Sequence, residues 1–361
     1  MVIRKTNSMV LALLILLLAV PTLVMGGGQG ESPAAEPSAV EDDHDHDHDD
    51  DHGGHDHDHD HDGVSSVEPV ALESGERLQV VATTNIVGDV VRNIIGDRAD
   101  LTVLIPQGQN PHGYTPAPRA VAAIERAHVV FVNGFDLEEN LLDTVETAAT
   151  GHIVPVSAGI EATGDHDHDH GEDDHEHEHA VGDPHVWFDP NHVMVWVDNI
   201  EHTVSGLLPE ESGAFEAAAE RYQGQLQELD ADIRRRVASL PESRRKIVID
   251  HASLDYFADR YGFEVIGTVI PATTDQAEPS AQAVARLVEV IRQEDVPAVF
   301  VGATASQGLE GLVNAVADEV GGAIGVGSLL TGSLAPEGEP GDTYLEFMEY
   351  NVTQIVENLA D

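Results

Sequence analysis

Residues 209–240 read PEESGAFEAAAERYQGQLQELDADIRRRVASL and form the longest helical pattern in the chain. Apolar side chains recur along them at spacings of three and four, which predicts a helix with one buried stripe that ends at Pro241. At 1.5 Å per residue this helix is roughly 45 Å long, about the height of a whole lobe. We therefore expect one stiff helix packed along both halves of the molecule. Its stripe comprises Phe215, Ala218, Tyr222, Leu226, Leu229, Ile233, Val237 and Leu240.

On each side of this helix, short apolar runs alternate with helical stretches. Continuous apolar strands separated by helices predict parallel sheets that are covered on both faces. The expected fold class is therefore α/β, with two lobes, each a mainly parallel sheet flanked by helices, bridged by one long rigid helix. Ligands of such sheets bind beyond the carboxyl ends of the strands, so a cleft between the lobes is the expected site. The expected strands are 78–84, 101–105, 129–132, 152–156, 246–250, 263–270, 298–301 and 323–326, and the expected helices are 86–95, 118–127, 137–149, 191–207, 253–261, 280–293, 307–320 and one from 343.

The N-terminus has two basic residues followed by an apolar run from Met9 to Met25, the pattern of an export signal. We assign residues 1–26 to a signal peptide or an uncleaved anchor, which places the protein in the periplasm or on the outer face of the cytoplasmic membrane. Residues 27–76 offer almost nothing to bury and are predicted to be a disordered tether, with ordered structure beginning near Arg77.

The remaining chain divides into three predicted parts. Residues 77–208 form an N-terminal α/β lobe that carries a His-rich loop at 161–182. The linking helix occupies residues 209–240, and residues 241–361 form a C-terminal α/β lobe.

The formal net charge is −49, and the two His-rich tracts account for only part of it. Such a surface repels nucleic acid and anionic lipid and concentrates cations. A saline or acidic habitat would favour the same surface. The chain has no cysteine, which excludes disulfides, thiolate metal sites and a lipid-modified lipoprotein anchor. Any transition-metal site must therefore use His and carboxylate side chains.

Two tracts of alternating His and acidic residues lie in the tether and in the predicted loop. Neighbouring imidazoles can chelate metal ions in pairs, but ordering a flexible chain costs entropy, so we expect several weak, exchanging sites. Two interpretations stay open: the tracts collect and buffer metal ions such as zinc, or they are neutral solvated insertions. The auxiliary candidates are His44, His46, His48, His52, His55, His57, His59 and His61 in the first tract, and His166, His168, His170, His175, His177 and His179 in the second.

The sequence from His175 to His179 formally matches the metalloprotease pattern HExxH. That motif requires a buried helix with both imidazoles on one face. Here it lies in low-complexity sequence with no apolar face, so we interpret it as a chance match. We expect a protein that is not an enzyme.

Three other histidines stand in loops or at strand ends. His112 lies in QGQNPHGYTPAP, His185 lies in DPHVWFDP, and His251 directly follows the predicted strand KIVID. Neutral imidazoles that converge from both lobes on one cleft would suit a borderline cation such as zinc. Taken singly, each could equally be a hydrogen-bonded structural histidine.

Four histidines remain outside the tracts, and we expect ordinary structural roles for them. His128 and His152 open predicted strands. His192 and His202 fall on one predicted helix without a partner at ligand spacing.

Several stretches together resemble the zinc/manganese solute-binding proteins of ABC transporters, the periplasmic or surface receptors that deliver a divalent metal to a membrane permease and its ATPase. The resemblance covers nearly the whole expected ordered chain. It implies two α/β lobes bridged by one long helix, with the metal between them. We expect a monomer, and its acidic charge argues against nucleic-acid binding. The stretches that carry it are IPQGQNPHGYTPAPRAV (105–121), DPHVWFDP (183–190), DHASLDYFADRYGFEVIG (250–267) and AEPSAQAVARLVEVI (277–291).

The resemblance implies that His112, His185 and His251 are the metal ligands. The family's fourth position, usually an Asp after a late strand, falls near Gly327, which offers no side-chain ligand. Three imidazoles favour Zn²⁺ over Mn²⁺, which prefers a more carboxylate-rich set. The resemblance also links His-rich insertions just before His185 to zinc-type members.

Other functions stay open at this point. Within the same family the alternative cargo is Mn²⁺ or another divalent ion. Outside it, the alternatives are a zinc-dependent hydrolase and a zinc-storage or cell-adhesion protein at the surface.

Overall fold

The computed structural model of the chain describes residues 64–162, 182–321 and 324–360. The predicted export signal, both His-rich tracts and most of the predicted tether lie outside the described residues. Among the residues that are described, no helix is both long enough and apolar enough to cross a membrane.

The N-terminal lobe contains a four-stranded sheet with the order β2-β1-β3-β4, in which every neighbouring pair is parallel. Successive side chains of a strand point to opposite faces. Val80 and Ala82 therefore pack with α1 and α4 on one face, whereas Val81 packs with α2 and α3 on the other. The elements are β1 (Leu78–Ala82), α1 (Asn85–Ile95), β2 (Ala99–Val103), α2 (Pro118–Ile124), β3 (Val129–Val132), α3 (Asn140–Ala148), β4 (His152–Pro155), the 3₁₀ turn η1 (Val186–Phe188) and α4 (Pro190–Leu207).

The C-terminal lobe repeats this topology with the order β6-β5-β7-β8, again parallel throughout. Helices α7 and α8 cover one face, where Val248 and Val299 point, and α9 covers the other, where Ile249 and Phe300 point. In both lobes the first strand of the lobe is central, so its carboxyl end lies where the strand order reverses. The elements are β5 (Lys246–His251), α6 (Asp255–Tyr261), β6 (Glu264–Ile270), α7 (Ala281–Glu294), β7 (Ala298–Gly302), α8 (Gln307–Val320), β8 (Gly325–Leu329) and α9 (Tyr344–Ala360).

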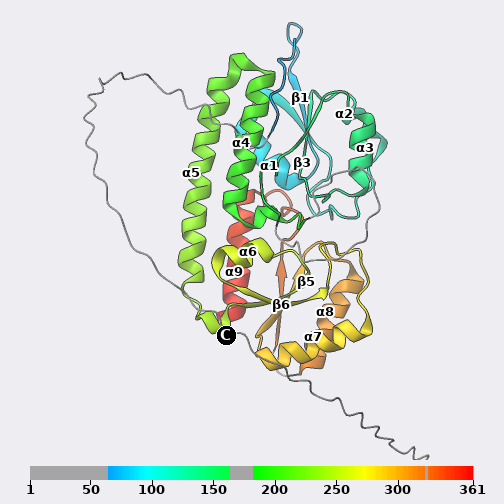
Figure 1. Ribbon diagram of the computed structural model, residues 1–361, viewed down its shortest axis with the longest axis vertical. Helices are drawn as coiled ribbons and strands as arrows, with labels where there is room; N and C mark the ends of the chain where they lie inside the picture. The colour runs from blue at the N-terminus through cyan, green and yellow to red at the C-terminus, as the bar shows by residue number, and fades with distance from the viewer. Residues whose placement is uncertain (1–63, 163–181, 322–323, 361) are drawn as a thin grey trace, which may run out of the picture. The chain divides into compact units, whose positions relative to one another are not determined.

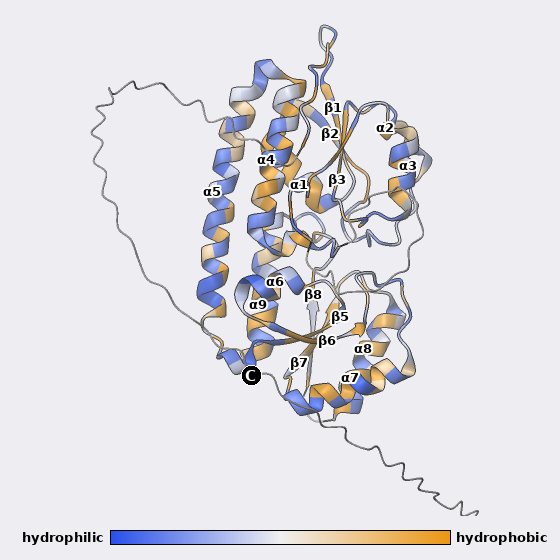
Figure 2. Cartoon of the chain, in the orientation of Figure 1, coloured by the Kyte–Doolittle hydropathy of each residue, from blue (hydrophilic) through white to orange (hydrophobic). Residues whose placement is uncertain are grey.

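The predicted long helix is present as α5 (Ser212–Val237), preceded by a 3₁₀ turn at Pro209–Glu211. Its stripe from Phe215 to Val237 is buried. The helix runs beside α4, packs on α1 in the first lobe and contacts α6 and α9 in the second (Figure 1). Its remaining positions are largely hydrophilic, as Figure 2 shows. The two-lobe α/β fold predicted from the sequence is therefore confirmed.

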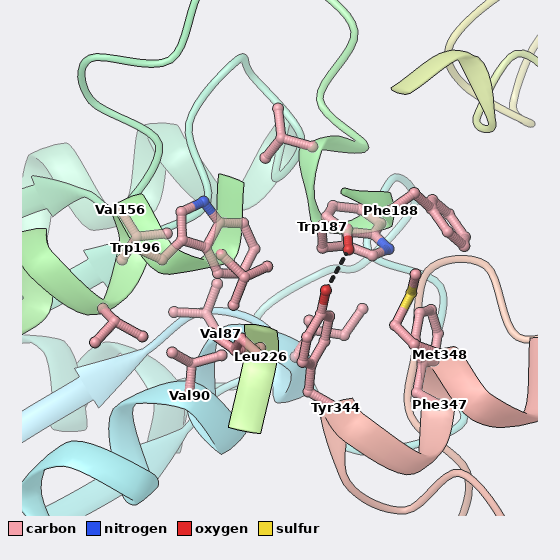
Figure 3. Close-up of a cluster of buried hydrophobic side chains, with 14 of the residues drawn as sticks. Val87, Val90, Val156, Trp187, Phe188, Trp196, Leu226, Tyr344, Phe347 and Met348 are labelled. Carbon is pink, nitrogen blue, oxygen red and sulfur yellow. Dashed lines mark hydrogen bonds between the residues drawn. The ribbon is translucent and has the colours of Figure 1, made fainter. Parts of the chain in front are cut away.

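One hydrophobic core continues from the first lobe through α4, α5 and α9. Figure 3 shows Trp187, Trp196 and Leu226 in this core with Tyr344 and Phe347 from α9. The Tyr344 hydroxyl donates a hydrogen bond to the Trp187 carbonyl at 2.7 Å. Because residues far apart in the chain share this core, the two lobes are held in one packed unit.

Residues 64–76 pack against the first lobe, although the sequence analysis expected order only from Arg77. Val64, Val67, Val70 and Leu72 contact the core. The Val70 amide donates to the Leu207 carbonyl at 3.0 Å. These four aliphatic side chains supply the apolar surface that the upstream sequence lacks, so the expected boundary is wrong for this segment.

The helix α3 begins at Asn140, three residues later than the predicted range 137–149. The reason is a run of left-handed backbone at Phe135 (φ 53°), Asp136 (φ 55°) and Glu139 (φ 33°), which a helix cannot contain. This turn aims Glu139 toward the centre described below.

A charged network fastens α5 to the second lobe. Arg260 donates two hydrogen bonds of 3.1 Å to the carboxylate of Asp230, and Tyr261 donates a third of 3.0 Å. Arg234 adds another of 3.1 Å from within α5. Burial alone would raise the pKa of Asp230, but these hydrogen bonds outweigh it and hold the pKa below its ordinary value.

We expect Asp230→Asn to lower the free energy of unfolding at pH 7 by about 1 kcal/mol, because the Arg260 fork loses its charged acceptor. The folded-state pKa lies below the unfolded value of about 3.9, so this stabilisation is present above that pH and is lost as the pH falls through the folded pKa. Urea denaturation from pH 7 to pH 3 measures it. The control is Asp232→Asn, whose carboxylate pairs with the exposed Arg235. An equal, pH-independent effect of both substitutions would contradict the assignment.

Candidate metal centre

Three buried histidines meet where the two lobes face each other. His112 lies in the loop after β2, His185 immediately precedes η1, and His251 is the last residue of β5, at the point where the strand order reverses. Their exposed fractions are 3%, 0% and 4%. The structure therefore brings together the three residues that the sequence analysis singled out.

The Nε2 atoms of the three rings point toward one another. The Nε2 atom of His185 is 3.3 Å from that of His112 and 3.4 Å from that of His251. One ligand atom from each residue lies within 4.8 Å of the other two. This spacing fits three nitrogen ligands around a single cation at about 2.0–2.1 Å from each.

His112 and His185 are set up as neutral ligands. Burial and, to a smaller extent, the neighbouring His185 and His251 together lower the pKa of His112 to about 3. Burial, with His251 beside it, also holds the pKa of His185 well below its ordinary value. Since only a neutral imidazole offers a lone pair to a metal, protons compete weakly for these two rings at neutral pH.

Two of the rings are oriented by aspartates on their outer nitrogens. His185 Nδ1 lies 2.7 Å from Asp183 Oδ1, and His251 Nδ1 lies 2.8 Å from Asp250 Oδ1. A carboxylate accepts the Nδ1 proton, which leaves the Nε2 lone pair directed at the centre. The second oxygen of Asp250 accepts from the Gly302 amide at 2.8 Å. Burial outweighs the hydrogen bond from the His185 amide and raises the pKa of Asp183 to about 7.

His112 is held differently from the other two ligands. Its Nδ1 has no hydrogen-bond partner among the described residues, and the nearest carboxylate oxygen, on Glu139, lies 3.6 Å away. The loop is fixed through the backbone, because the His112 amide donates to the Asn110 side-chain oxygen at 3.0 Å. His112 is therefore the least constrained ring of the three.

The turn that carries His185 is held from both lobes. Asn133 at the end of β3 donates to the Pro184 carbonyl at 3.0 Å. Tyr256 of α6 donates to the Asp183 carbonyl at 2.9 Å. The Trp187 indole donates to the Thr331 carbonyl at 3.1 Å. The ligand turn therefore stays in place without help from a bound ion.

The resemblance places the family's fourth ligand position near Gly327, which has no side-chain ligand to offer. Gly327 lies in the middle of β8, paired with Phe300, and a Cβ there would lie 2.7 Å from the Phe300 ring. The strand extends to Leu329, three residues beyond the predicted range 323–326, so the segment after it begins later. Among the described residues, no carboxylate joins the three histidines within the 4.8 Å spacing.

The remaining histidines outside the tracts lie away from this group. His128 Nδ1 accepts a hydrogen bond from the Gln79 amide at 2.8 Å, and His152 is exposed at the start of β4. His192 packs edge-on against Tyr256, and burial lowers its pKa. His202 lies half-buried on α4. The fourteen tract histidines lie outside the described residues, so the auxiliary sites stay a prediction.

The sequence and the fold both match known metal-binding proteins. A family model described as "ZnuA: Zinc-uptake complex component A periplasmic" matches residues 80–358. The manganese-binding lipoprotein MntA of Halalkalibacterium halodurans is 33% identical over 288 residues, which cover 80% of this chain and 90% of that protein. The periplasmic zinc-binding protein TroA from Treponema pallidum superposes with a TM-score of 0.70 at 29% identity, covering 79% of this chain and all of that one.

We expect Asp250→Asn to weaken metal binding by about 10–100-fold, because Asn can no longer act as a pure acceptor for His251 Nδ1–H. The substitution keeps the side-chain shape and an oxygen for the Gly302 amide, so the melting temperature of the apo protein should change little. Isothermal titration with Zn²⁺ measures the affinity, with Asp232→Asn on the surface of α5 as the control. Unchanged affinity would show that the Asp250 contact does not orient the ligand.

Proposed function

Since this chain belongs to the ZnuA family of metal-binding receptors of ABC transporters, which are not enzymes, we propose that it captures Zn²⁺ outside the cytoplasm and delivers it to a membrane permease. The observation that supports this proposal most directly is the convergence of three buried imidazoles. The Nε2 atoms of His112 and His251 lie 3.3 Å and 3.4 Å from that of His185. Two of these rings have strongly lowered pKa values, so they offer lone pairs at neutral pH.

The choice of zinc rests on the donor set. Three nitrogen ligands without a thiolate suit Zn²⁺, whereas Mn²⁺ prefers oxygen ligands. Manganese is the second candidate, because the relative from Halalkalibacterium halodurans is named manganese-binding. Because most nitrogen and oxygen sites bind Zn²⁺ more tightly than Mn²⁺, uptake separates the two: cells that lack the receptor should lose Zn²⁺ uptake and keep Mn²⁺ uptake.

The proposed partners are the permease and the ATPase of an ABC transporter. The family description places its members in the periplasm, which agrees with the basic and apolar pattern of residues 1–26. We propose that the receptor acts there as a monomer, because both lobes and all three proposed ligands belong to one packed unit.

His185→Ala should abolish the single tight Zn²⁺ site and leave several weak ones, since His185 is the central member of the ligand group. Calorimetry of the full-length protein should show the loss of one tight ion per chain. The matched control is His152→Ala, at an exposed position on β4, which should bind as the unchanged protein does. Retention of one tight Zn²⁺ in His185→Ala would refute the ligand assignment.

The auxiliary histidines are proposed to collect zinc for this site. Removal of residues 165–179 should leave the tight site intact, reduce the number of weakly bound Zn²⁺ ions, and slow uptake only when zinc is scarce. The measurements are equilibrium dialysis of the purified protein and uptake by cells at limiting zinc. Unchanged uptake would show that the tract is a neutral insertion. If the protein instead stored zinc or acted in adhesion, loss of the tight site would not change zinc uptake by the cells.

A further inference from the structure

A loop of the second lobe reaches the ligand loop of the first. Residues 271–280 connect β6 to α7, and Asp275 at their middle accepts a 2.6 Å hydrogen bond on Oδ2 from the side-chain nitrogen of Asn110. The oxygen of the same Asn110 amide accepts from the His112 backbone amide at 3.0 Å. One amide side chain thus connects a metal-ligand loop to a carboxylate from the opposite lobe.

The neighbouring Gln276 fits closely over the ligand loop. Its side-chain nitrogen donates to Asp275 Oδ1 at 2.6 Å. A Cβ at Gly113, directly after His112, would lie 3.1 Å from the Gln276 side-chain oxygen. The 271–280 loop therefore lies directly against the ligand loop, and both oxygens of the half-buried Asp275 accept hydrogen bonds from amide groups.

The charge of Asp275 acts on the histidine centre. It acts to raise the pKa values of both His112 and His185, although burial lowers both by more. The carboxylates of Asp183 and Asp250 are already occupied by the outer Nδ1 atoms of His185 and His251. Asp275 instead accepts hydrogen bonds from two neutral amides. A cation can replace these amides, and the free-energy cost is roughly that of one or two ordinary hydrogen bonds.

We propose that Asp275 supplies the fourth protein ligand of the captured cation, exchanging its hydrogen bond from Asn110 for a bond to the ion. The inference rests on the proposed function, because it assigns a further residue to the same site. Three neutral imidazoles leave a divalent ion with its full charge in a buried position, and one carboxylate halves that charge. Since Asp275 and His112 come from opposite lobes, the new bond also closes the 271–280 loop over the bound ion.

Two substitutions distinguish a metal ligand from a residue that only holds the two loops together. Asp275→Asn keeps an oxygen that can accept from Asn110 but loses the anionic ligand, so we expect Zn²⁺ to dissociate 10–100-fold faster. Asn110→Ala removes the hydrogen bond between the two loops and keeps the carboxylate. Because it also removes the acceptor of the His112 amide, we expect faster Zn²⁺ dissociation with the carboxylate still bound to the ion. The matched control is Glu278→Gln, an exposed carboxylate on the same loop, which should leave the rate unchanged.

The rates are measured by stopped-flow transfer of Zn²⁺ from the full-length protein to an excess chelator. The visible spectrum of the Co²⁺-loaded protein is the second readout, and it should change in Asp275→Asn but not in Asn110→Ala. If Asp275→Asn releases Zn²⁺ at the rate of the unchanged protein and leaves the Co²⁺ spectrum unchanged, Asp275 only holds the two loops together and the proposal is wrong. Failure of the unchanged protein to bind a tight divalent ion would instead refute the proposed function itself.

Discussion

The burial of aromatic and aliphatic side chains between α4, α5 and α9 is the interaction on which the rest of the structure depends. Trp187 stands two residues after a proposed ligand, and Tyr344 fixes its carbonyl from the far end of the chain. A large aromatic side chain buries about 150–250 Å², worth roughly 4–6 kcal/mol at 25 cal/mol per Å². The position of His185 is therefore set by core packing that is much stronger than any single polar contact in the centre.

This packing explains how the protein tolerates three imidazoles so close together. Charged rings at this spacing would repel one another, and burial disfavours the charge still further. The structure keeps His112 and His185 neutral, and it directs the Nδ1 atoms of His185 and His251 outward to Asp183 and Asp250, so that the Nε2 atoms of those two rings face the centre. An apo centre of this kind is preorganised, because ordering the ligands costs little when the ion arrives.

The sequence was sufficient for most of the fold and for the three histidines. Periodicity located the stripe from Phe215 to Val237 because helix packing depends on local spacing. The position of β8 was missed because GAIGVGSLL has small residues on both sides of the strand, which leaves its register open. Asp275 was missed for another reason: it lies in a polar loop without periodicity, and only the folded chain brings it to Asn110. Its neighbours in the sequence carry no sign of that contact.

The same energies indicate how a bound ion can leave. Separating the lobes as rigid bodies would expose the core around Trp187 and Tyr344 at a cost of several kcal/mol for each ring. Moving the loop of His112 requires the loss of side-chain hydrogen bonds worth about 1 kcal/mol each, and that ring has no carboxylate hydrogen-bonded to its Nδ1. His185 and His251 are held by the packed elements that carry them and by Asp183 and Asp250, whereas His112 lies on a loop that can move at lower cost. Local movement of the His112 and 271–280 loops is therefore the least costly route for metal entry and release, and a permease that promotes release would act most effectively on those loops.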